Sequence, residues 1–294
     1  MISIIISSAD SRVLQEVRDN VAATIGVPYE IIAIDNSAGK QGICSVYNKG
    51  LLRAKYPILC FMHEDIQIKT INWGDVIIKK FKKNPDVGVM GVMGSSYKSM
   101  TPSGWSSLGI ENIFYGNLIQ HHKYSAEPPR HLYTNPYNEK LSQVACLDGV
   151  WLCTTKKVAR EFMFDEVNFT GFHVYDLDFS LSVGQKYKLA VTYDILIEHF
   201  SEGRFDEKWM MDTLKLHEKW NNVLPINCDS LSIEEVIHSE KATFKHFIKR
   251  LSSLNLPLHH AHKMLRLNNR FLNLNTKLFF KLQYYIVLRY LSLK

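Results

Sequence analysis

Residues 58–68, with the sequence ILCFMHEDIQI, constrain the fold more than any other stretch of the chain. The apolar residues that open it predict a buried strand. His63, Glu64 and Asp65 follow at once, and polar side chains at the carboxyl end of a strand indicate a ligand site in an open α/β sheet. In an extended backbone His63 and Asp65 would point to the same side and could hold one divalent cation. The alternative is a helix start, with Glu64 and Asp65 as first-turn acids.

The first 95 residues alternate β-branched runs with segments of helical length. Asp10 or Ser11 could cap the first helix, and Gly26 and Pro28 would end it. Strands are expected near residues 2–6, 30–37, 58–68 and 87–93, and helices near 12–24, 43–55 and 72–83. This β-α-β order predicts a parallel sheet with right-handed crossovers.

Cysteine usage and hydropathy bear on the compartment. The five cysteines form no CxxC pair, and an odd, scattered set indicates free thiols in a reducing environment. The N-terminal run MISIIISSADS lacks a basic segment and favours a first strand over a signal peptide. No stretch reaches about 18 uncharged apolar residues, so no transmembrane helix is expected. These features favour a cytoplasmic protein.

The formal net charge of +6 conceals an asymmetry. Residues 241–294 contain 11 Lys or Arg and no Asp or Glu, whereas the preceding 240 residues contain 24 basic and 29 acidic residues. Charge alone would permit RNA binding, but no RNA-binding motif accompanies it, so no nucleic-acid partner is expected. We expect a mildly acidic globular body followed by a basic tail.

The middle of the chain, residues 95–143, lacks apolar periodicity and is rich in Ser, Tyr, Asn, Pro and His. A long irregular segment of this kind is typical of a functional loop or lid. Trp105 within it could stack on a sugar or simply pack the loop. Asp148 and Trp151, in the ordered segment that follows, are expected to face the ligand-binding cavity at the ends of the strands.

Two predicted strands end in an acid, Asp35 and Asp65, and a glycine-bearing loop follows the first of them. Carboxylates at this edge of a sheet could accept hydrogen bonds from a ribose hydroxyl or a base N–H. Neither a GxGxxG nor a GxxxxGK[ST] phosphate loop is present. Besides these two acids, the candidate nucleotide-sugar-binding residues are Ser7, Asn48 and Glu64.

The string YDLDFSLSVG, residues 175–184, predicts a helix that ends at Gly184. Asp176 and Asp178 lie at its start, where the helix dipole stabilises an ionised carboxylate. Alone, Asp176 would be read as a helix cap. Strands are expected to continue to His199, which alone would be read as a buried histidine.

The order of these motifs resembles the family-2 glycosyltransferases of the GT-A fold. The motifs are Asp35, the cluster at residues 63–65, Asp148-Gly149, the string GFHVYDLDFSL and the string HFSEG. The match is closest to the branch typified by a streptomycin-biosynthesis-type glycosyltransferase domain. The resemblance covers about residues 1–205. It implies an α/β, GT-A (Rossmann-like), mostly parallel sheet flanked by helices, with a helical, basic C-terminal extension at residues 206–294.

The resemblance implies a role for each matching residue. Asp35 matches the acid that contacts the nucleoside. His63 and Asp65 match the two ends of the Asp-X-Asp metal motif. Asp176 matches the catalytic base, and His199 matches a histidine that some GT-A enzymes use as a further metal ligand.

Three positions depart from the family pattern. His63 replaces the usual first Asp, Tyr175 stands where a Glu is usual, and Ser182 stands where many relatives have Arg. The Gln-X-X-Arg-Trp motif of processive synthases is absent, and the nearest string is HEKW at residues 217–220. A non-processive enzyme is therefore expected.

The implied activity is an inverting, metal-dependent transfer of a sugar from a nucleotide diphosphate sugar to a glycan or glycolipid acceptor, in cell-surface polysaccharide synthesis. The cofactor would be Mn²⁺ or Mg²⁺, and an imidazole ligand is more comfortable on Mn²⁺. The alternative is a non-catalytic nucleotide-sugar or carbohydrate-binding protein, because fold does not determine function. The candidate acceptor-binding residues are Asp148, Trp151 and Trp105.

The tail repeats six basic residues at intervals of three, four, seven, four and eight, which would place them on one face of a helix with Leu, Phe and Ile mostly opposite. They are Lys263, Arg266, Arg270, Lys277, Lys281 and Arg289. A basic amphipathic helix over about residues 262–294 would lie on an anionic membrane surface, and the enzyme would be peripheral on the inner face of the membrane. The alternatives are packing on the body or on a second subunit, which leaves the oligomeric state open.

Overall fold

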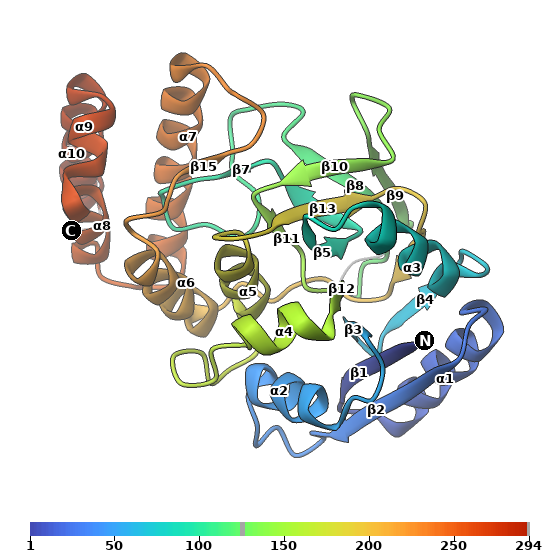
Figure 1. Cartoon of the computed structure of the whole chain (residues 1–294). Coiled ribbons are helices and arrows are strands. Elements are labelled where there is room, and N and C mark those ends of the chain that lie inside the picture. The colour runs from blue at the N-terminus through green and yellow to red at the C-terminus, as the bar shows by residue number, and fades with distance from the viewer. Residues whose placement is uncertain (124–126, 293–294) are drawn as a thin grey trace. The chain divides into compact units, whose positions relative to one another are not determined.

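The computed structural model describes residues 1–123 and 127–292, and the chain forms two compact units. The first unit consists of residues 1–95 and 114–203. The second consists of residues 96–113 together with the chain from residue 204 onward. Figure 1 labels most of the helices and strands of both units.

A seven-stranded sheet forms the centre of the first unit, in the order β10-β13-β5-β12-β3-β1-β2 (Figure 1). Parallel ladders join β1 to β2, β1 to β3 and β13 to β5. The strands are β1 (Ile2–Ser8), β2 (Tyr29–Asp35), β3 (Ile58–Met62), β5 (Val87–Gly91), β10 (Leu141–Val144), β12 (Trp151–Thr155) and β13 (Lys188–Thr192). The predicted α/β class is confirmed.

Helices connect these strands at nearly the predicted positions. Asp10 caps the first of them, because its side chain accepts hydrogen bonds from the backbone N–H groups of Arg12 and Val13. Thr155 caps α4 in the same way, accepting from Val158 N. The helices are α1 (Ser11–Thr24), α2 (Ile43–Arg53), α3 (Trp73–Lys83), α4 (Lys156–Phe162) and α5 (Tyr175–Val183).

The sheet is mixed because β10 runs antiparallel to β13, and β12 runs antiparallel to both of its neighbours, β3 and β5. Trp151, the first residue of β12, pairs with Met62, the last residue of β3. The chain therefore enters β12 at the carboxyl edge of the parallel strands and has to run back across the sheet. The parallel arrangement expected from the sequence holds for β1, β2 and β3, and β12 interrupts it.

A second sheet has the order β11-β6-β8-β14-β4, with β9 paired to β8. Its strands are β4 (Ile66–Ile68), β6 (Met93–Ser95), β8 (Phe114–Gln120), β9 (Arg130–Thr134), β11 (Cys146–Leu147) and β14 (Ile197–His199). The expectation of an irregular segment at residues 95–143 is therefore wrong for β8, β9 and β10. Polar residues in this segment do not exclude a buried strand, as Asn117 in β8 shows. Its side chain can be buried because its Nδ2 donates to the carbonyls of Tyr193 and Ile195.

The helix-start alternative for residues 63–65 is also wrong. These residues form a bend between β3 and β4, and the chain continues as a strand at Ile66. The same bend means that the segment is not the continuous extended strand that was first expected.

A cluster of aromatic rings lies under this bend. The rings of Phe164 and Phe179 stack with centroids 4.4 Å apart, and Tyr47 contacts Phe61 at 5.0 Å. Tyr175, the first residue of α5, packs edge-on against Tyr47 at 5.6 Å. The cluster is buried, and the close packing of such rings holds Tyr175 in one orientation.

The second unit is mainly helical. A capping box starts α7, in which Ser232 accepts from Glu235 N and the Glu235 side chain accepts from Ser232 N. Its elements are β7 (Tyr97–Lys98), α6 (Glu207–Lys219), β15 (Ile226–Asn227), α7 (Ile233–Ser253), α8 (His259–Arg266), η1 (Leu267–Asn269), α9 (Arg270–Leu274) and α10 (Thr276–Ser292). No helix within the described ranges is long and apolar enough to cross a membrane.

The expected single basic helix at residues 262–294 is wrong for the part of the tail that the structure describes. Asn268 and Asn269 adopt positive φ values of 51° and 54°, which break the helix between α8 and α9. Lys263 is paired with Glu218 at 2.6 Å, and Arg270 is half-buried. The six basic residues therefore do not share one solvent-facing stripe. Residues 293 and 294 lie outside the described residues.

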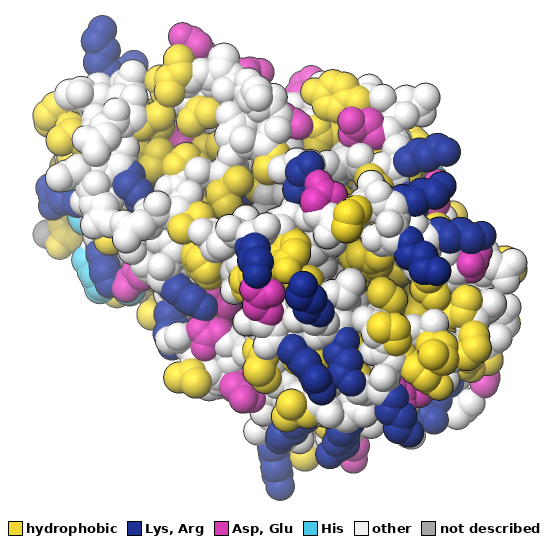
Figure 2. All heavy atoms as spheres, viewed as in Figure 1, with side chains coloured by type: hydrophobic (Ala, Val, Ile, Leu, Met, Phe, Trp, Pro, Cys, Tyr) yellow, Lys and Arg dark blue, Asp and Glu magenta, His cyan; other side chains and the backbone are white. Residues whose placement is uncertain are grey.

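Exposed cations are not confined to the tail. Figure 2 shows Lys and Arg side chains gathered over α3 and α4 of the first unit. Lys79, in α3, is 67% exposed and pairs with Asp75 on the same helix. The net acidity of the body is therefore not spread evenly over its surface.

Candidate functional site

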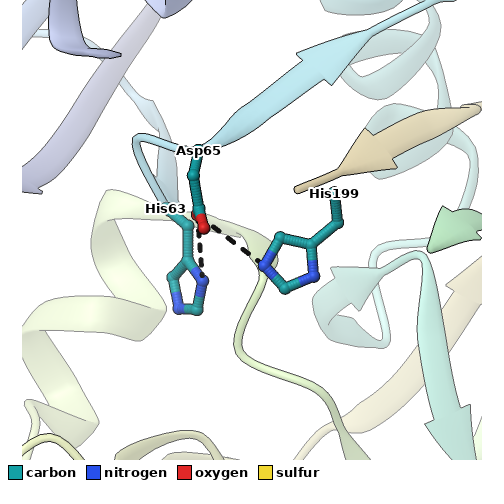
Figure 3. Close-up of side chains that lie close together, drawn as sticks. All are labelled: His63, Asp65 and His199. Atoms are coloured by element: carbon teal, nitrogen blue, oxygen red, sulfur yellow. Dashed lines mark ion pairs between the residues drawn. The ribbon is translucent and has the colours of Figure 1, made fainter. Parts of the chain in front are cut away.

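The ladder between β4 and β14 assembles three potential metal ligands, His63, Asp65 and His199. His63 and Asp65 lie in the bend before β4, and His199 ends β14, where it pairs with Ile66. Both imidazole rings point toward the Asp65 carboxylate (Figure 3). His63 Nδ1 lies 3.8 Å and His199 Nε2 3.7 Å from Asp65 Oδ1. The three ligand atoms lie within 4.8 Å of one another, so one cation could contact all three.

Gln120, at the end of β8, determines which nitrogen of His199 faces the cluster. Its Nε2 donates to the carbonyls of His121 and Ser201, each at 2.7 Å, so its Oε1 remains as the acceptor. Oε1 lies 3.2 Å from His199 Nδ1, which must therefore carry the ring proton. The unprotonated Nε2 is buried on the side of Asp65 and has no hydrogen-bond partner among the described residues. Such a lone pair is what a metal ligand requires.

Tyr175 orients His63 in the same way. Its hydroxyl donates to the Gly149 carbonyl at 3.0 Å and can therefore only accept from His63 Nε2, which lies 2.8 Å away. With the ring proton on Nε2, the lone pair of His63 is on Nδ1, the atom nearest Asp65. Both histidines thus present their lone pairs to the cluster.

The charges of the cluster also suit a cation. Burial alone would raise the pKa of Asp65, but the imidazoles of His63 and His199 and a hydrogen bond from Ser201 outweigh it and hold that pKa below its ordinary value. Burial, and then the neighbouring His63, lower the pKa of His199. At neutral pH the cluster therefore contains an ionised carboxylate and a neutral His199.

Residues 148–150 join this cluster to Asp176 at the start of α5. The carbonyl of Val150 accepts from His63 N at 3.1 Å, and Gly149 N donates to Asp176 Oδ2 at 3.0 Å. A Cβ atom at Gly149 would collide with the Tyr175 hydroxyl, so this close approach requires glycine. One short turn therefore positions both His63 and the predicted catalytic base.

The carboxyl group of Asp176 has an unusual acidity. Burial, and then the charge of Asp148, raise its pKa to about 7, against the partial compensation of backbone N–H donors that include Gly149. A carboxyl group with a pKa near neutrality can exchange protons at physiological pH. The helix cap that was the alternative interpretation would require only an ordinary, ionised carboxylate.

The predicted nucleotide-sugar-binding residues have varied surroundings. Glu64 Oε1 accepts from Ala9 N at 2.9 Å and from Asp10 N at 3.2 Å, which anchors the connection between β1 and α1. A cavity of about 240 Å³ lies beside Glu64 and Asp65. Ser7 in β1 is half-buried.

Two further members of that set lie at the surface and in the interior. Asp35 is exposed at the end of β2 and accepts from Ser37 N at 2.9 Å. Asn48 is buried, and both polar atoms of its amide bond to the backbone of Phe164, at 2.9 and 3.0 Å. Their roles in nucleotide binding stay predictions.

The predicted acceptor-binding residues do not form one cluster in the first unit. Asp148 is half-buried and accepts from Val150 N at 2.9 Å. Trp151 in β12 has no exposed surface and packs edge-on against Trp73. Trp105 belongs to the second unit. Their roles in acceptor binding also stay predictions.

Two residues of the site were not among the sequence candidates, Gln120 and Tyr175. Tyr175 had a visible signal, because it replaces the Glu expected at that position. Gln120 had none, because it lies in the segment expected to be irregular and its role depends on the β8–β14 ladder.

Comparison with known proteins decides the family. A model of the family described as "Glycosyltransferase like family" matches residues 3–222, which is most of the chain. The chain belongs to the glycosyltransferase-like family. A search of curated proteins finds no match to this chain.

Solved structures agree on the fold. GalNAc-T7, crystallised with UDP, GalNAc and Mn²⁺, matches at a TM-score of 0.53 and 10% identity, covering 87% of this chain and 55% of its own. TarS from S. aureus matches at 0.50 and 11%, covering 86% and 43%. Residues 1–349 of TarS with UDP match at 0.50 and 11%, covering 90% and 78%. The chain thus spans about half the length of the first two proteins, and at these identities the likeness concerns the GT-A fold alone.

Replacing Tyr175 with Phe should weaken metal binding. The variant keeps the buried ring but removes the oxygen that accepts from His63 Nε2, so the tautomer with its lone pair toward Asp65 is no longer favoured. Loss of such a partner typically costs about 10- to 100-fold in metal affinity. Calorimetric titration of the protein with Mn²⁺ measures the change. Tyr187→Phe, which removes a hydroxyl that bonds to Glu161 away from the cluster, is the matched control, and equal affinities of Tyr175→Phe and the natural protein would contradict the assignment.

Asp176 should make stability fall as the pH rises. Its pKa of about 7 in the folded state lies above the value of about 3.9 in the unfolded chain, so the folded state binds the proton more tightly. The stabilisation is complete below pH about 4 and is lost as the pH rises through about 7. Asn does not titrate, so the free energy of unfolding of Asp176→Asn lacks this loss. The difference in unfolding free energy between the variant and the natural protein should therefore shift in favour of the variant between pH 5 and pH 8. The expected shift is about 1.4 kcal/mol for each pKa unit lost in that range, or roughly one to a few kcal/mol.

Urea unfolding with a chelator at both pH values tests this difference. Asp35→Asn is the control, because hydrogen bonds from Ser37 lower the pKa of that exposed carboxylate. A stability difference for Asp176→Asn that is the same at both pH values would refute the raised pKa.

Proposed function

We propose that this member of the glycosyltransferase-like family transfers a sugar from a nucleotide diphosphate sugar to a glycan or glycolipid acceptor. The observation that carries the proposal is the convergence of the His63 and His199 lone pairs on the Asp65 carboxylate, each set by a neighbouring hydrogen bond. A carboxyl group with a pKa of about 7, Asp176, is tied to the same turn. The fold is that of GT-A enzymes, and GalNAc-T7 in this group of neighbours was crystallised with UDP, GalNAc and Mn²⁺.

The three ligand atoms fit a divalent cation. When bound, such an ion supplies Lewis-acid stabilisation of the departing diphosphate. Two imidazoles and one carboxylate favour Mn²⁺ over Mg²⁺, which prefers oxygen ligands. The buried, unpartnered Nε2 of His199 supports this use, because a polar atom without a partner costs free energy unless a ligand satisfies it.

Asp176 is the proposed base. Its carboxylate takes the proton of the acceptor hydroxyl while the acceptor oxygen bonds to the anomeric carbon and the bond from that carbon to the diphosphate breaks. Attack from the face opposite the diphosphate inverts the anomeric centre. A pKa near 7 places the group close to the optimum for a base at neutral pH.

We further propose that the enzyme is non-processive and belongs to the streptomycin-biosynthesis-type branch. The HEKW string that stands nearest to the processive motif lies at the end of α6. Its His217 has no exposed surface and is bonded to Lys98 and to the carbonyl of Met100, which indicates a structural role. This structural role and the absence of the processive motif from the sequence support a non-processive enzyme.

We also infer that α10 contacts a membrane surface. Leu278, Leu282 and Ile286 are buried on one side of the helix. The opposite side exposes a second apolar stripe at helical spacing, formed by Phe280, Tyr284, Val287, Leu288 and Leu291, three of which are more than 60% exposed. Exposed Lys277 and Lys281 flank this stripe.

An apolar stripe beside cations fits an anionic lipid surface, where the side chains insert and the lysines meet head groups. A lipid-linked acceptor on the cytoplasmic face would then lie on the same surface as the enzyme. The buried side of α10 also shows that part of the tail packs on the second unit, so packing and membrane contact are not exclusive.

Asp176→Asn should keep donor binding and lose roughly 10²- to 10⁴-fold in turnover, because only the proton acceptor is removed. Release of nucleoside diphosphate from a panel of UDP-sugars with Mn²⁺ measures turnover, and calorimetry measures donor affinity. Asp194→Asn, which alters a surface carboxylate paired with Lys80, is the control. Normal turnover by Asp176→Asn would eliminate it as the base, whereas donor binding without transfer by the natural protein would favour a non-catalytic nucleotide-sugar-binding protein.

Replacing two residues of the exposed stripe with Glu should abolish vesicle binding. Phe280→Glu with Leu288→Glu places two charges where the side chains would insert, so co-flotation with phosphatidylserine-containing vesicles at low salt should be lost. Leu52→Glu with Ile71→Glu changes two exposed apolar residues of the first unit and should leave binding intact. If the natural protein stays unbound, or both double variants bind alike, α10 is not the membrane contact.

A further inference from the structure

The second unit contains a cavity of about 250 Å³ that shares no residue with the metal-ligand cluster. Part of segment 102–108 forms one wall, and Phe205 together with side chains of α6 and α7 forms the rest. Four Trp or Phe rings belong to the lining, those of Trp105, Phe205, Trp209 and Phe247.

Two buried charged residues hold the segment that forms this wall. Glu240, in α7, has no exposed surface and accepts from Ser99 Oγ, Met100 N and Thr101 Oγ1, at 2.7 to 2.9 Å. Lys98 is equally buried and donates at 2.8 to 3.0 Å to Ser103 and Gly104. Charge-assisted bonds of this kind are strong, because a buried charge without a partner is costly.

The far end of the same segment is also fixed. Leu108 N donates to the side chain of Thr243 in α7 at 3.0 Å. The floor of the cavity consists of buried side chains, among them Met210 and Phe247. The cavity is therefore pre-formed, and a ligand entering it has little of the protein to order.

The lining combines flat apolar rings with one permanent cation. Phe205 and Trp209 meet edge to face, with centroids 5.1 Å apart, and the guanidinium of Arg250 lies 5.3 Å from the Phe205 ring centroid. The described residues of the lining include no Asp or Glu. Burial, then Arg250 and Lys249, lower the pKa of His246, so Arg250 carries the positive charge there at neutral pH.

Such a lining has a definite chemical preference. The apolar face of a pyranose ring can pack on an indole or phenyl ring, and a guanidinium binds a carboxylate or phosphate through two parallel hydrogen bonds. A purely apolar ligand would leave Arg250 without an anionic partner in the cavity, and a cationic ligand would meet a like charge.

We propose that this cavity is a carbohydrate-binding site for a pyranose that carries a negative charge, as a carboxylate or a phosphate. Trp209 and Trp105 provide the stacking surfaces and Arg250 binds the anionic group. The site deepens the proposed transferase function, because it assigns to the acceptor a charged sugar unit, but binding in it requires neither donor nor metal.

Titration of the full chain with three small glycosides tests the proposal, and a chelator is present throughout so that transfer cannot contribute. The probes are methyl glucoside, methyl glucuronide and glucose 1-phosphate, followed by calorimetry and by tryptophan fluorescence. The two anionic probes should bind about tenfold more tightly than the neutral one. A preference for only one of them identifies carboxylate or phosphate as the recognised group.

Variants separate charge from stacking. Arg250→Gln should remove the preference for the anionic probes, and Trp209→Leu should weaken the binding of all three probes. The control is Lys249→Gln, which removes a neighbouring exposed cation outside the lining and should change neither the preference nor the affinities. Equal affinity for charged and neutral probes, binding unaffected by Arg250→Gln and Trp209→Leu, or no binding of any probe would overturn the proposal. Because these measurements involve no donor, binding here with no transferase activity would refute the proposed function and leave the cavity assignment standing.

Discussion

The backbone ladder between β4 and β14 is the constraint on which the candidate site depends. It places the carboxyl end of β14 beside the bend that follows β3, and so brings His199 to Asp65 and His63. The ladder needs only main-chain hydrogen bonds, but its register decides everything that follows. A slip of one residue would turn the His199 side chain to the other face of the sheet and dissolve the cluster.

Two hydrogen-bonded neighbours then orient the histidines for metal binding. Gln120 and Tyr175 each fix the ring proton of one histidine on the nitrogen that points away from Asp65. Tyr175 is itself held by the aromatic cluster under the bend. The packing of the apolar core therefore fixes the Tyr175 ring, and the hydroxyl group of that ring orients His63.

The residues show why some of this could be predicted from the sequence and some could not. The apolar run before His63 and the cap at Asp10 act locally, and these local signals predicted the strand and the first helix well. The strand around Asn117 was missed because its polarity is satisfied by distant carbonyls, which no local pattern can reveal. The spacing of the basic residues in the tail predicts one continuous helix, but the positive φ values of Asn268 and Asn269 interrupt it, and residue spacing does not reveal backbone conformation. For the same reason the ligand candidates were visible in the sequence, but the partner that orients His199 was not.

The amide of Gln120 serves two segments at once. Its oxygen meets His199, and its nitrogen donates to the carbonyl of Ser201, just beyond β14. A displacement of the backbone after β14 that moved the Ser201 carbonyl would remove one of the two hydrogen bonds that orient the amide, and only the bond to the His121 carbonyl would then hold its oxygen toward the imidazole ring. The segment that leaves the sheet at Phe200 is therefore linked to the metal-ligand cluster through Gln120. A movement of its main chain would weaken the preference for the His199 tautomer whose Nε2 can bind a metal.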